Sequence, residues 1–438
     1  MNKILFKDLE HFLDKNIFVE GAVEQVRDLK NIQFLILKDS TGKIQVTIEK
    51  KDTNYKLNNI VSNLNIDCTV KVKGVLKYNP NIKLNSKELI AEDIEITSMN
   101  EYDLPLYYKN LNSSTIDTRL NYRYLDLRNQ RNLLIFKIQT MLINTMRQYL
   151  IKNNFIEIHT PKLIGTASEG GADVFSVNYF GTKAYLAQSP QFYKQMAISS
   201  GFDRVFEIAP AFRAENSNSY RHSTEFTSFD VEIAYINSID ELIELEEDML
   251  IEGIKVVKQL YDKEIEYYFN TVIDVPKKPF PKLTLQEIYN ELEKTYNYYV
   301  DNDAKGDMNI ETEKLLSRYI LEKYNHQFVF ITEFDAKSRP FYHLRQNGVP
   351  QGFDLIWNGC EITTGSLREN RYNNLLQQVI ESNIEMNNLE FYLNFFKYGC
   401  PPHGGFAIGI DRLTMLLLNL PSLKESMFIF RGPHRILP

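Results

Sequence analysis

Cysteine is scarce in this chain of 438 residues, and its three cysteines, Cys68, Cys360 and Cys400, lie far apart. They form neither a CxxC pair nor an even-numbered framework, which argues against disulfides and against structural zinc. No apolar run approaches the roughly 18 residues of a membrane-spanning helix. The N-terminal residues contain no secretory apolar segment. We therefore expect a cytoplasmic protein in a reducing environment, without membrane association.

An excess of positive charge is also missing. Lysine and arginine number 50 against 57 aspartate and glutamate residues, which gives a formal net charge of −7. This balance argues against non-specific coating of nucleic acid, which requires a basic surface, although local basic patches could still bind a folded RNA. Composition alone favours a metabolic enzyme, and the length suggests two or three domains.

The common nucleotide-binding and hydrolase motifs do not occur. The chain has no GxxxxGK[ST] loop, no GxGxxG after a strand, no HExxH and no GxSxG. These absences exclude a P-loop or a Rossmann nucleotide site. Any nucleotide chemistry must therefore come from other clusters of residues.

The N-terminal part contains five strand-like segments separated by turn residues. They are residues 17–23, 32–39, 44–48, 68–76 and 88–96. Short strands at this spacing predict a small barrel, either an OB-fold or an SH3-like barrel.

The rest of the chain predicts a different class of domain. Residues 98–132 are rich in asparagine and serine, and an amphipathic helical stripe follows from Leu134 to Tyr149. Strands and helices then alternate without regular βαβ spacing, which favours an α+β domain with an antiparallel sheet flanked by helices. We expect a barrel domain at 1–100, a hinge at 101–132 and the α+β domain at 133–438.

A strand–loop–strand hairpin is predicted at residues 205–226. Its polar and aromatic residues are Arg213, Glu215, Arg221, His222 and Phe226. Guanidinium groups bind phosphate oxygens bidentately and an aromatic ring can stack on a base, so a nucleotide site fits this segment. An exposed hairpin with salt bridges fits it equally well.

Two further clusters lie near the C-terminus. In residues 403–418 glycines would let a strand approach a ligand closely, and Arg412 opens an apolar helix whose positive N-terminus could face an anion. In residues 352–369, Glu361 and Thr364 could hold Mg²⁺ through hard oxygen ligands. Taken alone, these clusters are also compatible with a tight strand–helix turn and with an exposed edge hairpin.

The order and separation of the three clusters resemble motifs 2 and 3 of class II aminoacyl-tRNA synthetases. Residues 155–161, with the helix before them, resemble motif 1, the dimer-interface element. Nearly the whole chain, including residues 118–128, is similar to aspartyl-tRNA synthetases of the archaeal and eukaryotic type. The resemblance implies a homodimer with an N-terminal OB-fold that binds the anticodon. It also implies ATP, L-aspartate and tRNA(Asp) as substrates and Mg²⁺ as cofactor.

The resemblance implies a role for each ATP-site residue. Arg213 would contact the α-phosphate and the substrate carboxylate, and Phe226 would stack on adenine with Glu215 nearby. The β/γ-phosphates would be held beside Gly409 by Arg221, His222 and Arg412. Mg²⁺ would be bound by Glu361 and Thr364. Arg213 and Arg412 are the expected catalytic residues.

The same resemblance implies an aspartate site. Lys194 and Arg368 would meet the side-chain carboxylate, and Gln191 and Thr364 would also contact the substrate. An ammonium group has three donors and no acceptor, so a buried lysine favours a carboxylate over a neutral amide. Glu169 resembles the glutamate of a mobile loop that meets the α-ammonium.

Recognition of tRNA is implied at two barrel positions, with Phe34 stacking on the central anticodon base and Gln45 reading it. By itself, Phe34 would be expected in the barrel core. The tryptophan that discriminating relatives carry near Glu24 is missing, which hints that tRNA(Asn) is also charged. The alternatives are an asparagine–tRNA ligase, a non-catalytic RNA-binding paralogue and an amide-forming ligase that acts without tRNA.

Overall fold

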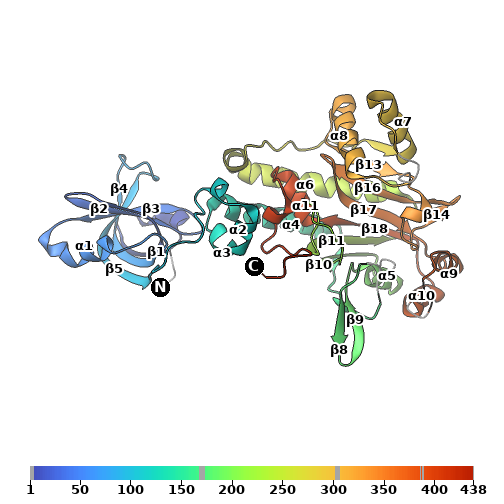
Figure 1. Ribbon diagram of the computed structural model, residues 1–438, viewed down its shortest axis with the longest axis horizontal. Coiled ribbons are helices and arrows are strands. Elements are labelled where there is room, and N and C mark those ends of the chain that lie inside the picture. Colours follow the sequence, from blue (N-terminus) through green and yellow to red (C-terminus); the bar gives the residue numbers. More distant parts are fainter. Residues whose placement is uncertain (1–3, 167–172, 301–305, 385, 387–388, 438) are drawn as a thin grey trace. The chain divides into compact units, whose positions relative to one another are not determined.

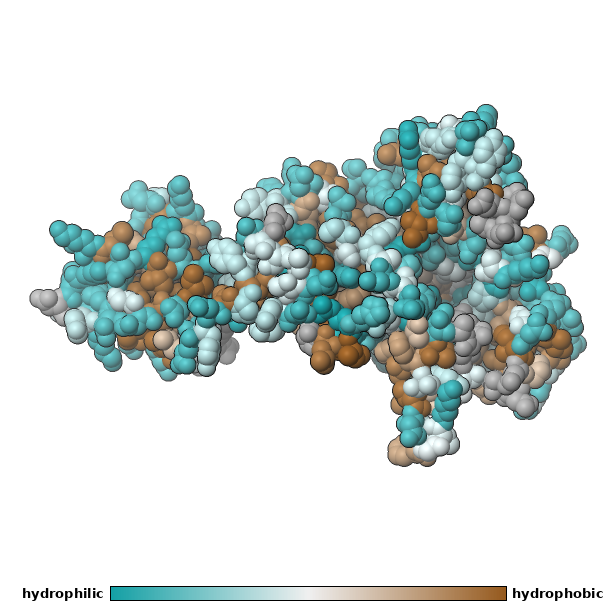
Figure 2. All heavy atoms as spheres, viewed as in Figure 1, coloured by the Kyte–Doolittle hydropathy of each residue, from teal (hydrophilic) through white to brown (hydrophobic). Residues whose placement is uncertain are grey.

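Figure 1 shows the computed structural model of the chain, which describes residues 4–166, 173–300, 306–384, 386 and 389–437. The chain divides into two compact units, Met1–Pro105 and Leu106–Pro438. Hydrophilic residues cover most of the visible face of each unit (Figure 2). Within the described residues, no helix is both long and apolar enough to cross a membrane.

The first unit is a closed five-stranded barrel with the strand order β1-β2-β3-β5-β4. Its elements are η1 (Phe6–Phe12), β1 (Asn16–Asp28), β2 (Ile32–Lys38), β3 (Lys43–Glu49), η2 (Asp52–Asn54), α1 (Tyr55–Ser62), β4 (Thr69–Tyr78) and β5 (Lys87–Ser98). A helix between the third and fourth strands of a five-stranded barrel is the OB-fold arrangement, so the OB-fold prediction is confirmed over the SH3-like alternative.

An eight-stranded sheet with the order β12-β13-β16-β17-β18-β11-β10-β6 forms the centre of the second unit. The strands are β6 (Ile156–Glu157), β10 (Arg204–Phe212), β11 (Glu225–Ala234), β12 (Lys282–Thr284), β13 (Phe328–Thr332), β16 (Gly352–Trp357), β17 (Cys360–Arg368) and β18 (His403–Gly409). All neighbours are antiparallel except the pair at each end, β12–β13 and β10–β6. The predicted α+β class with an antiparallel sheet is confirmed.

Helices and two small sheets surround this sheet. The helices are α2 (Ile116–Asn121), α3 (Arg123–Asp126), α4 (Gln130–Lys152), α5 (Gln191–Ser199), α6 (Ile239–Phe269), α7 (Leu285–Tyr296), α8 (Ile310–Tyr324), α9 (Tyr372–Glu381), α10 (Glu390–Lys397), α11 (Ile410–Leu417) and α12 (Leu423–Ser426), with the 3-10 turns η3 (Leu111–Ser113) and η5 (Ala336–Ser338). The small sheets are β7 (Leu163–Ile164), β9 (Thr182–Leu186) and β8 (Ser176–Tyr179), and β14 (Arg345–Gln346) with β15 (Val349–Pro350).

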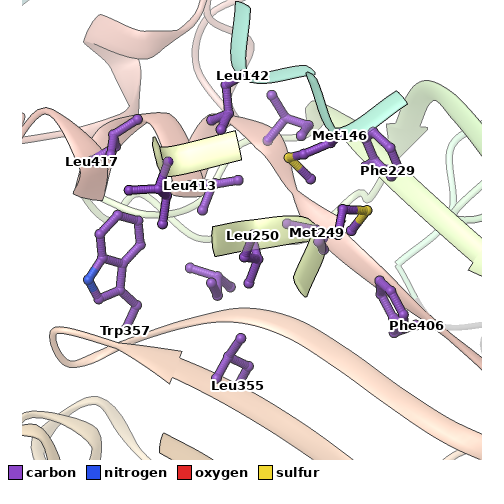
Figure 3. Close-up of a cluster of buried hydrophobic side chains, with 14 of the residues drawn as sticks. Leu142, Met146, Phe229, Met249, Leu250, Leu355, Trp357, Phe406, Leu413 and Leu417 are labelled. Atoms are coloured by element: carbon purple, nitrogen blue, oxygen red, sulfur yellow. The ribbon is translucent and has the colours of Figure 1, made fainter. Parts of the chain in front are cut away.

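One face of the large sheet forms the main hydrophobic core with α4, α6 and α11. Figure 3 shows Leu142 and Met146 of α4 and Leu250 of α6 beside Leu413 of α11, above Leu355 of β16. Helix α6 begins at a capping box formed by Ser238 and Glu241, which satisfies free N–H groups of its first turn. With one face covered by helices, polar side chains of the sheet can gather on the other.

The strands of the sheet separate these two faces by alternation. On β11, Phe229 and Val231 lie in the core, whereas Ser228, Asp230 and Glu232 alternate with them. Successive side chains of a strand point to opposite faces. The polar residues therefore gather on the face turned away from α4 and α6, where the candidate site lies.

Most of the expected hinge at 101–132 lies within the second unit, because the division falls between Pro105 and Leu106. Leu120 joins the main core. The Asp126 carboxylate binds both Arg119 (2.8 Å) and Arg123 (2.5 Å), and the Arg119 guanidinium also donates to Glu425 at 2.9 Å. Buried ion pairs therefore fix this segment to the C-terminal residues.

Candidate active site

A cavity of about 130 Å³ opens on the polar face of the sheet. It brings together all eight residues predicted to bind ATP and the predicted metal ligand Thr364. Its lining includes Arg213, Glu215, Arg221, His222, Phe226, Glu361, Thr364, Gly409 and Arg412. They come from the β10–β11 hairpin, β17, the end of β18 and the first turn of α11, so segments about 200 residues apart in the sequence meet at one place.

Arg213 lies at the mouth of the hairpin. Its sequence spacing with Glu215 suggests a shared strand face, but β10 ends at Phe212, and both residues belong to the loop. The Arg213 backbone N–H donates to Thr224 O at 2.9 Å. Its guanidinium lies 5.4 Å from the centre of the Phe226 ring and 3.8 Å from Glu215 Oε1. With its side chain 44% exposed, Arg213 remains accessible to an anionic ligand.

A β-bulge places Glu361 and Thr364 together. Strict alternation would put residues three apart on opposite faces. In the β16–β17 pairing, however, Glu361 lies opposite Ile356 and Thr363 opposite Leu355, so one extra residue is inserted on β17. Both Glu361 and Thr364 consequently line the cavity. The hairpin is not an edge hairpin, because β17 lies between β16 and β18.

Arg412 is fixed by backbone oxygens of the two other clusters. Its Nε donates to Arg221 O at 3.1 Å and its Nη1 to Glu361 O at 3.0 Å. The Glu361 carboxylate lies 3.5 Å away. A guanidinium held in this way at the first turn of α11 adds its charge to the positive end of the helix dipole. The combination suits a polyphosphate.

Arg221 has a partner that the sequence did not indicate. It forms a buried ion pair with Glu313 of α8, at 3.2 Å between Nη2 and Oε1 and with a closer contact from Nη1. Burial by itself lowers the pKa of Arg221, but the Glu313 carboxylate raises it above its usual range. The ion pair of Arg221 is therefore buried in the protein, whereas Arg213 and Glu215 form a longer and exposed pair at the mouth of the cavity.

His222 is half-buried beside this pair. Its Nδ1 lies within hydrogen-bond distance of two serine hydroxyls, Ser217 at 3.1 Å and Ser219 at 2.5 Å. Burial lowers the pKa of His222, and the positive charge of Arg412 lowers it further. Both effects favour the neutral form of His222, which lines the cavity.

The carboxylates around Thr364 suit a divalent cation that is completed by phosphate oxygens. Asp354 lies opposite Thr364 in the sheet and binds the Arg339 guanidinium at 2.9 and 2.5 Å. Burial raises the pKa of Asp354 to about 6; Arg339 opposes this shift and Glu361 adds to it. Within the described residues no three His, Cys, Asp or Glu side chains form a metal cage.

Lys194 and Arg368 meet in a second, buried cluster on the same face. Lys194 Nζ lies 3.0 Å from Asp230 Oδ1 and 3.3 Å from Glu232 Oε2. Arg368 binds Glu232 with two nitrogens, at 2.9 and 3.2 Å, and donates to Ser366 Oγ at 2.6 Å. Lys194 and Arg368 therefore both contact the Glu232 carboxylate. With Asp230, the cluster contains two positive and two negative side chains.

Glu232 remains ionised at the centre of this cluster. Burial by itself raises the pKa of Glu232, but Arg368 and Lys194 together lower it below its usual value. Gly405 on the neighbouring strand makes room for it, because a Cβ there would lie 2.3 Å from Glu232 Oε2 and 2.0 Å from Val231 O. Sequence analysis missed Asp230 and Glu232; the available signal was that Ser228, Asp230 and Glu232 alternate with the apolar Phe229, Val231 and Ile233.

Gln191 and Glu169 were also predicted to contact the substrate. Gln191 is buried in the first turn of α5, three residues before Lys194, so both lie on one helix face. Glu169 lies outside the described residues.

In the barrel unit, Phe34 and Gln45 lie on the outer surface of neighbouring strands. The core positions of β2 are Leu35 and Leu37, which places the half-buried Phe34 outside; its expected position in the core is wrong. Gln45 pairs with Ile36, two residues further along. Both side chains therefore share one face of the barrel.

Comparison with known proteins agrees with this architecture. Residues 115–430 match the family of class II tRNA synthetases (D, K and N), and residues 17–97 match the OB-fold nucleic acid binding domain. The chain is 38% identical to the aspartate–tRNA(Asp) ligase of Pyrococcus abyssi over 98% of both chains. It is 35% identical to the aspartate–tRNA(Asp/Asn) ligase of Aeropyrum pernix, over 98% of this chain and 97% of the relative.

A solved structure shares both units. The asparaginyl-tRNA synthetase of Pyrococcus horikoshii, complexed with asparaginyl-adenylate, aligns over 100% of both chains with a TM-score of 0.90 and 27% identity. The chain therefore belongs to the class II tRNA synthetases of the D, K and N group, and within it to the aspartyl-tRNA synthetases of the archaeal and eukaryotic type.

Proposed function

We propose that the chain is an aspartate–tRNA ligase, which activates L-aspartate with ATP and transfers it to tRNA(Asp). The observation that carries the choice of amino acid is the buried cluster in which Lys194 and Arg368 converge on Glu232. Two cationic side chains at the base of an amino-acid site suit a substrate with a second carboxylate. The cavity with Arg213 and Arg412 supplies a place for ATP on the same face of the sheet.

Donor capacity in this cluster favours aspartate over asparagine. The described contacts use two of the three Lys194 protons and three of the five Arg368 N–H groups. The remaining groups can only donate. A carboxylate offers them two accepting oxygens, whereas the asparagine amide offers one oxygen and an NH₂ group that would face a donor. The two protein carboxylates keep both cations charged and in place.

The first chemical step needs no general base, because the α-carboxylate of aspartate is ionised near neutral pH. One of its oxygens attacks the α-phosphorus of ATP, the bond to the bridging oxygen of the β-phosphate breaks, and pyrophosphate leaves. Arg213, at the mouth of the cavity, would balance charge on the α-phosphate, and Arg412 would hold the β/γ end. Catalysis then depends on positioning and on fixed charges.

The metal would be held by Glu361 and Thr364, which share the cavity wall through the bulge of β17. Bound Mg²⁺ supplies positive charge to the phosphate oxygens. Transfer follows when a ribose hydroxyl of the tRNA terminus attacks the aspartyl-adenylate carbonyl, and AMP leaves as the hydroxyl proton is released. We expect the 3′-hydroxyl to react, as is usual in this class.

Partners and location are proposed from the resemblance to the family. We propose a homodimer in which α4 and the strand after it contribute to the contact, and a cytoplasmic enzyme. Phe34 and Gln45 would bind the anticodon. One relative is named an aspartate–tRNA(Asp/Asn) ligase, so charging of tRNA(Asn) as well as tRNA(Asp) belongs to the proposal.

The amino acid is tested by ATP–pyrophosphate exchange with purified protein. We expect exchange with aspartate and little with asparagine. Arg368→Lys keeps the charge but loses the paired contact with Glu232; we expect a roughly ten- to hundredfold rise in KM for aspartate. Arg345→Lys is the matched control, because Arg345 pairs with the exposed Glu381 at the end of helix α9. Exchange that depends on asparagine alone would overturn the proposal.

Charging assays with tRNA(Asp) and tRNA(Asn) transcripts and labelled aspartate then define the RNA substrate. Aspartylation of both transcripts would identify an enzyme that does not discriminate. Aspartylation of tRNA(Asp) alone would restrict the proposal to that tRNA. Aspartylation of neither transcript, in protein that exchanges pyrophosphate, would contradict the transfer step.

A further inference from the structure

A buried hydrogen-bond chain connects Gln191 to two other elements. Gln191 Nε2 donates to Gln195 Oε1 at 3.0 Å, and the Tyr392 hydroxyl of α10 donates to the same oxygen at 2.9 Å. Gln195 Nε2 lies 2.9 Å from Nε2 of His403, the first residue of β18. His403 Nδ1 lies 2.8 Å from Pro401 O. All four side chains are at most 4% exposed, and Gln195, His403 and Tyr392 are called the Gln195 chain below.

The donor and the acceptor of each hydrogen bond follow from Pro401 O, the carbonyl oxygen at the end of the chain. A carbonyl oxygen can only accept, so His403 Nδ1 carries the proton and donates to Pro401 O. In neutral His403 the Nε2 atom then has no proton and accepts from the Gln195 amide nitrogen. The Gln195 oxygen is left to receive two donors, from Tyr392 and from Gln191. Each amide in the chain therefore has one satisfied orientation.

His403 stays neutral in this environment. Burial lowers the pKa of His403, although the nearby Glu232 carboxylate opposes this shift, and Arg368 adds to the lowering. The residue faces charged groups on β11 and β17, and Cys400 Sγ lies 3.7 Å from its Nδ1. A neutral ring is the form that the bond to Gln195 requires.

We propose that the Gln195 chain positions the substrate amino group: it commits the nitrogen of Gln191 to the protein and leaves the Gln191 carbonyl oxygen to accept from the α-ammonium of aspartate. This inference rests on the proposed function. The α-ammonium is the only donor of ionised aspartate, so an oriented amide oxygen matches that group alone. If the amide were free to turn, its NH₂ would meet the ammonium in one of two orientations, and two donors repel. Gln195 is thus a positioning residue, since it acts through Gln191.

The helix α5 explains why this orientation affects specificity. Gln191, Lys194 and Gln195 occupy positions i, i+3 and i+4, so they share one helix face. Lys194 serves the side-chain carboxylate of the substrate and Gln191 its amino group. A single short helix, held to α10 and β18 by the Gln195 chain, would therefore fix the distance between the two ends of aspartate.

A double-mutant cycle tests the proposal in the full-length protein. Gln195→Leu and Gln191→Leu should each raise KM for aspartate about ten- to hundredfold, because each loses an oriented hydrogen bond to a charged group. KM for ATP should change less than about twofold in either variant. The double variant should be no worse than Gln191→Leu alone, because both substitutions remove one contact. Effects that multiply would overturn the proposal, as would a wild-type KM in Gln195→Leu.

An inhibitor without the amino group gives an independent measurement. Succinate has both carboxylates of aspartate and no ammonium, so its competitive inhibition constant should be the same in wild type and in Gln195→Leu. Weaker inhibition by the same factor as the rise in KM would show general distortion of the site and overturn the proposal.

Two further variants separate positioning from folding. Tyr392→Phe removes one hydroxyl and keeps the aromatic packing, so it should raise KM for aspartate by a smaller factor in a folded protein, and add nothing to Gln191→Leu. Gln327→Leu is the matched control, since it deletes a glutamine that accepts from Trp357 Nε1 at 3.1 Å elsewhere in the unit; its KM should equal that of wild type. If the wild type showed no aspartate-dependent exchange, the proposed function would be wrong. If the enzyme is active but the rises in KM of Gln195→Leu and Gln191→Leu multiply in the double variant, only the positioning role of the Gln195 chain is wrong.

Discussion

Buried carboxylates in the catalytic unit differ in whether a positive group accompanies them. Glu232 has two cations within hydrogen-bond distance, and its pKa is lowered despite complete burial. Glu246 of α6 is equally buried, but the groups that act on it are the Thr363 hydroxyl and the carboxylates of Glu247 and Asp354, none of which is a cation. Burial raises the pKa of Glu246 to about 8. The paired carboxylate of Glu232 is thus a charged group, whereas burial favours the neutral acid at Glu246 on α6.

This difference predicts a pH-dependent effect of Glu246→Gln. The folded pKa of about 8 exceeds the ordinary value of 4.5, so between these values the folded state holds a proton that the unfolded state releases. Stability of the wild type must then fall as pH rises through this window. We expect Glu246→Gln to be more stable than wild type by about 1–4 kcal/mol at pH 8 and nearly equal at pH 5, measured by denaturant unfolding. Glu252→Gln, an exposed change on the same helix, should show no such trend.

At the scale of elements, sequence patterns predicted which segments of the site form strands, but they did not predict which side chains of those segments contact one another. Strand-like runs identify β10 and β11, whose apolar side chains such as Phe206 and Phe229 lie in the core. Alternation alone cannot place Glu361 and Thr364 on one face; the bulge does so, and it depends on pairing with β16. The ion pair between Glu313 and Arg221 could not be predicted for another reason. The two residues lie 92 positions apart in the sequence, and local sequence patterns contain no information on such contacts.

The contact between α8 and the β10–β11 loop gives an element-scale prediction. Removing one partner of a buried ion pair is strongly destabilising, so Glu313→Gln should lower the free energy of unfolding by about 3–5 kcal/mol. Phosphates of bound ATP can replace the missing negative charge beside Arg221. The rise in melting temperature caused by ATP should therefore be larger in the variant than in wild type. Glu322→Gln, an exposed change on the same helix, should leave this rise unchanged; an equal rise in Glu313→Gln would show that ATP does not contact Arg221.

At the scale of the whole molecule, the two units have separable tasks in the proposed function. Every described residue of the ATP cavity and of the Lys194 cluster belongs to the second unit. The expected anticodon residues belong to the first, on the outer face of a barrel whose core is closed by residues such as Leu35 and Val46. Amino-acid activation should therefore be independent of changes on the barrel surface, whereas transfer to tRNA should depend on them.

Phe34→Ala tests this separation. Stacking on a base contributes about 1–3 kcal/mol, so kcat/KM for tRNA in the charging reaction should fall roughly 5- to 150-fold, while aspartate-dependent pyrophosphate exchange stays at the wild-type rate. Phe18→Ala is the matched control, since Phe18 is a surface aromatic on β1 of the same barrel, with Lys71 Nζ 5.3 Å from its ring centre. Because Phe34 lies outside the core, its loss should not unfold the barrel. Unchanged charging by Phe34→Ala would exclude base stacking at this position, and a parallel loss of exchange would show that the two tasks are coupled.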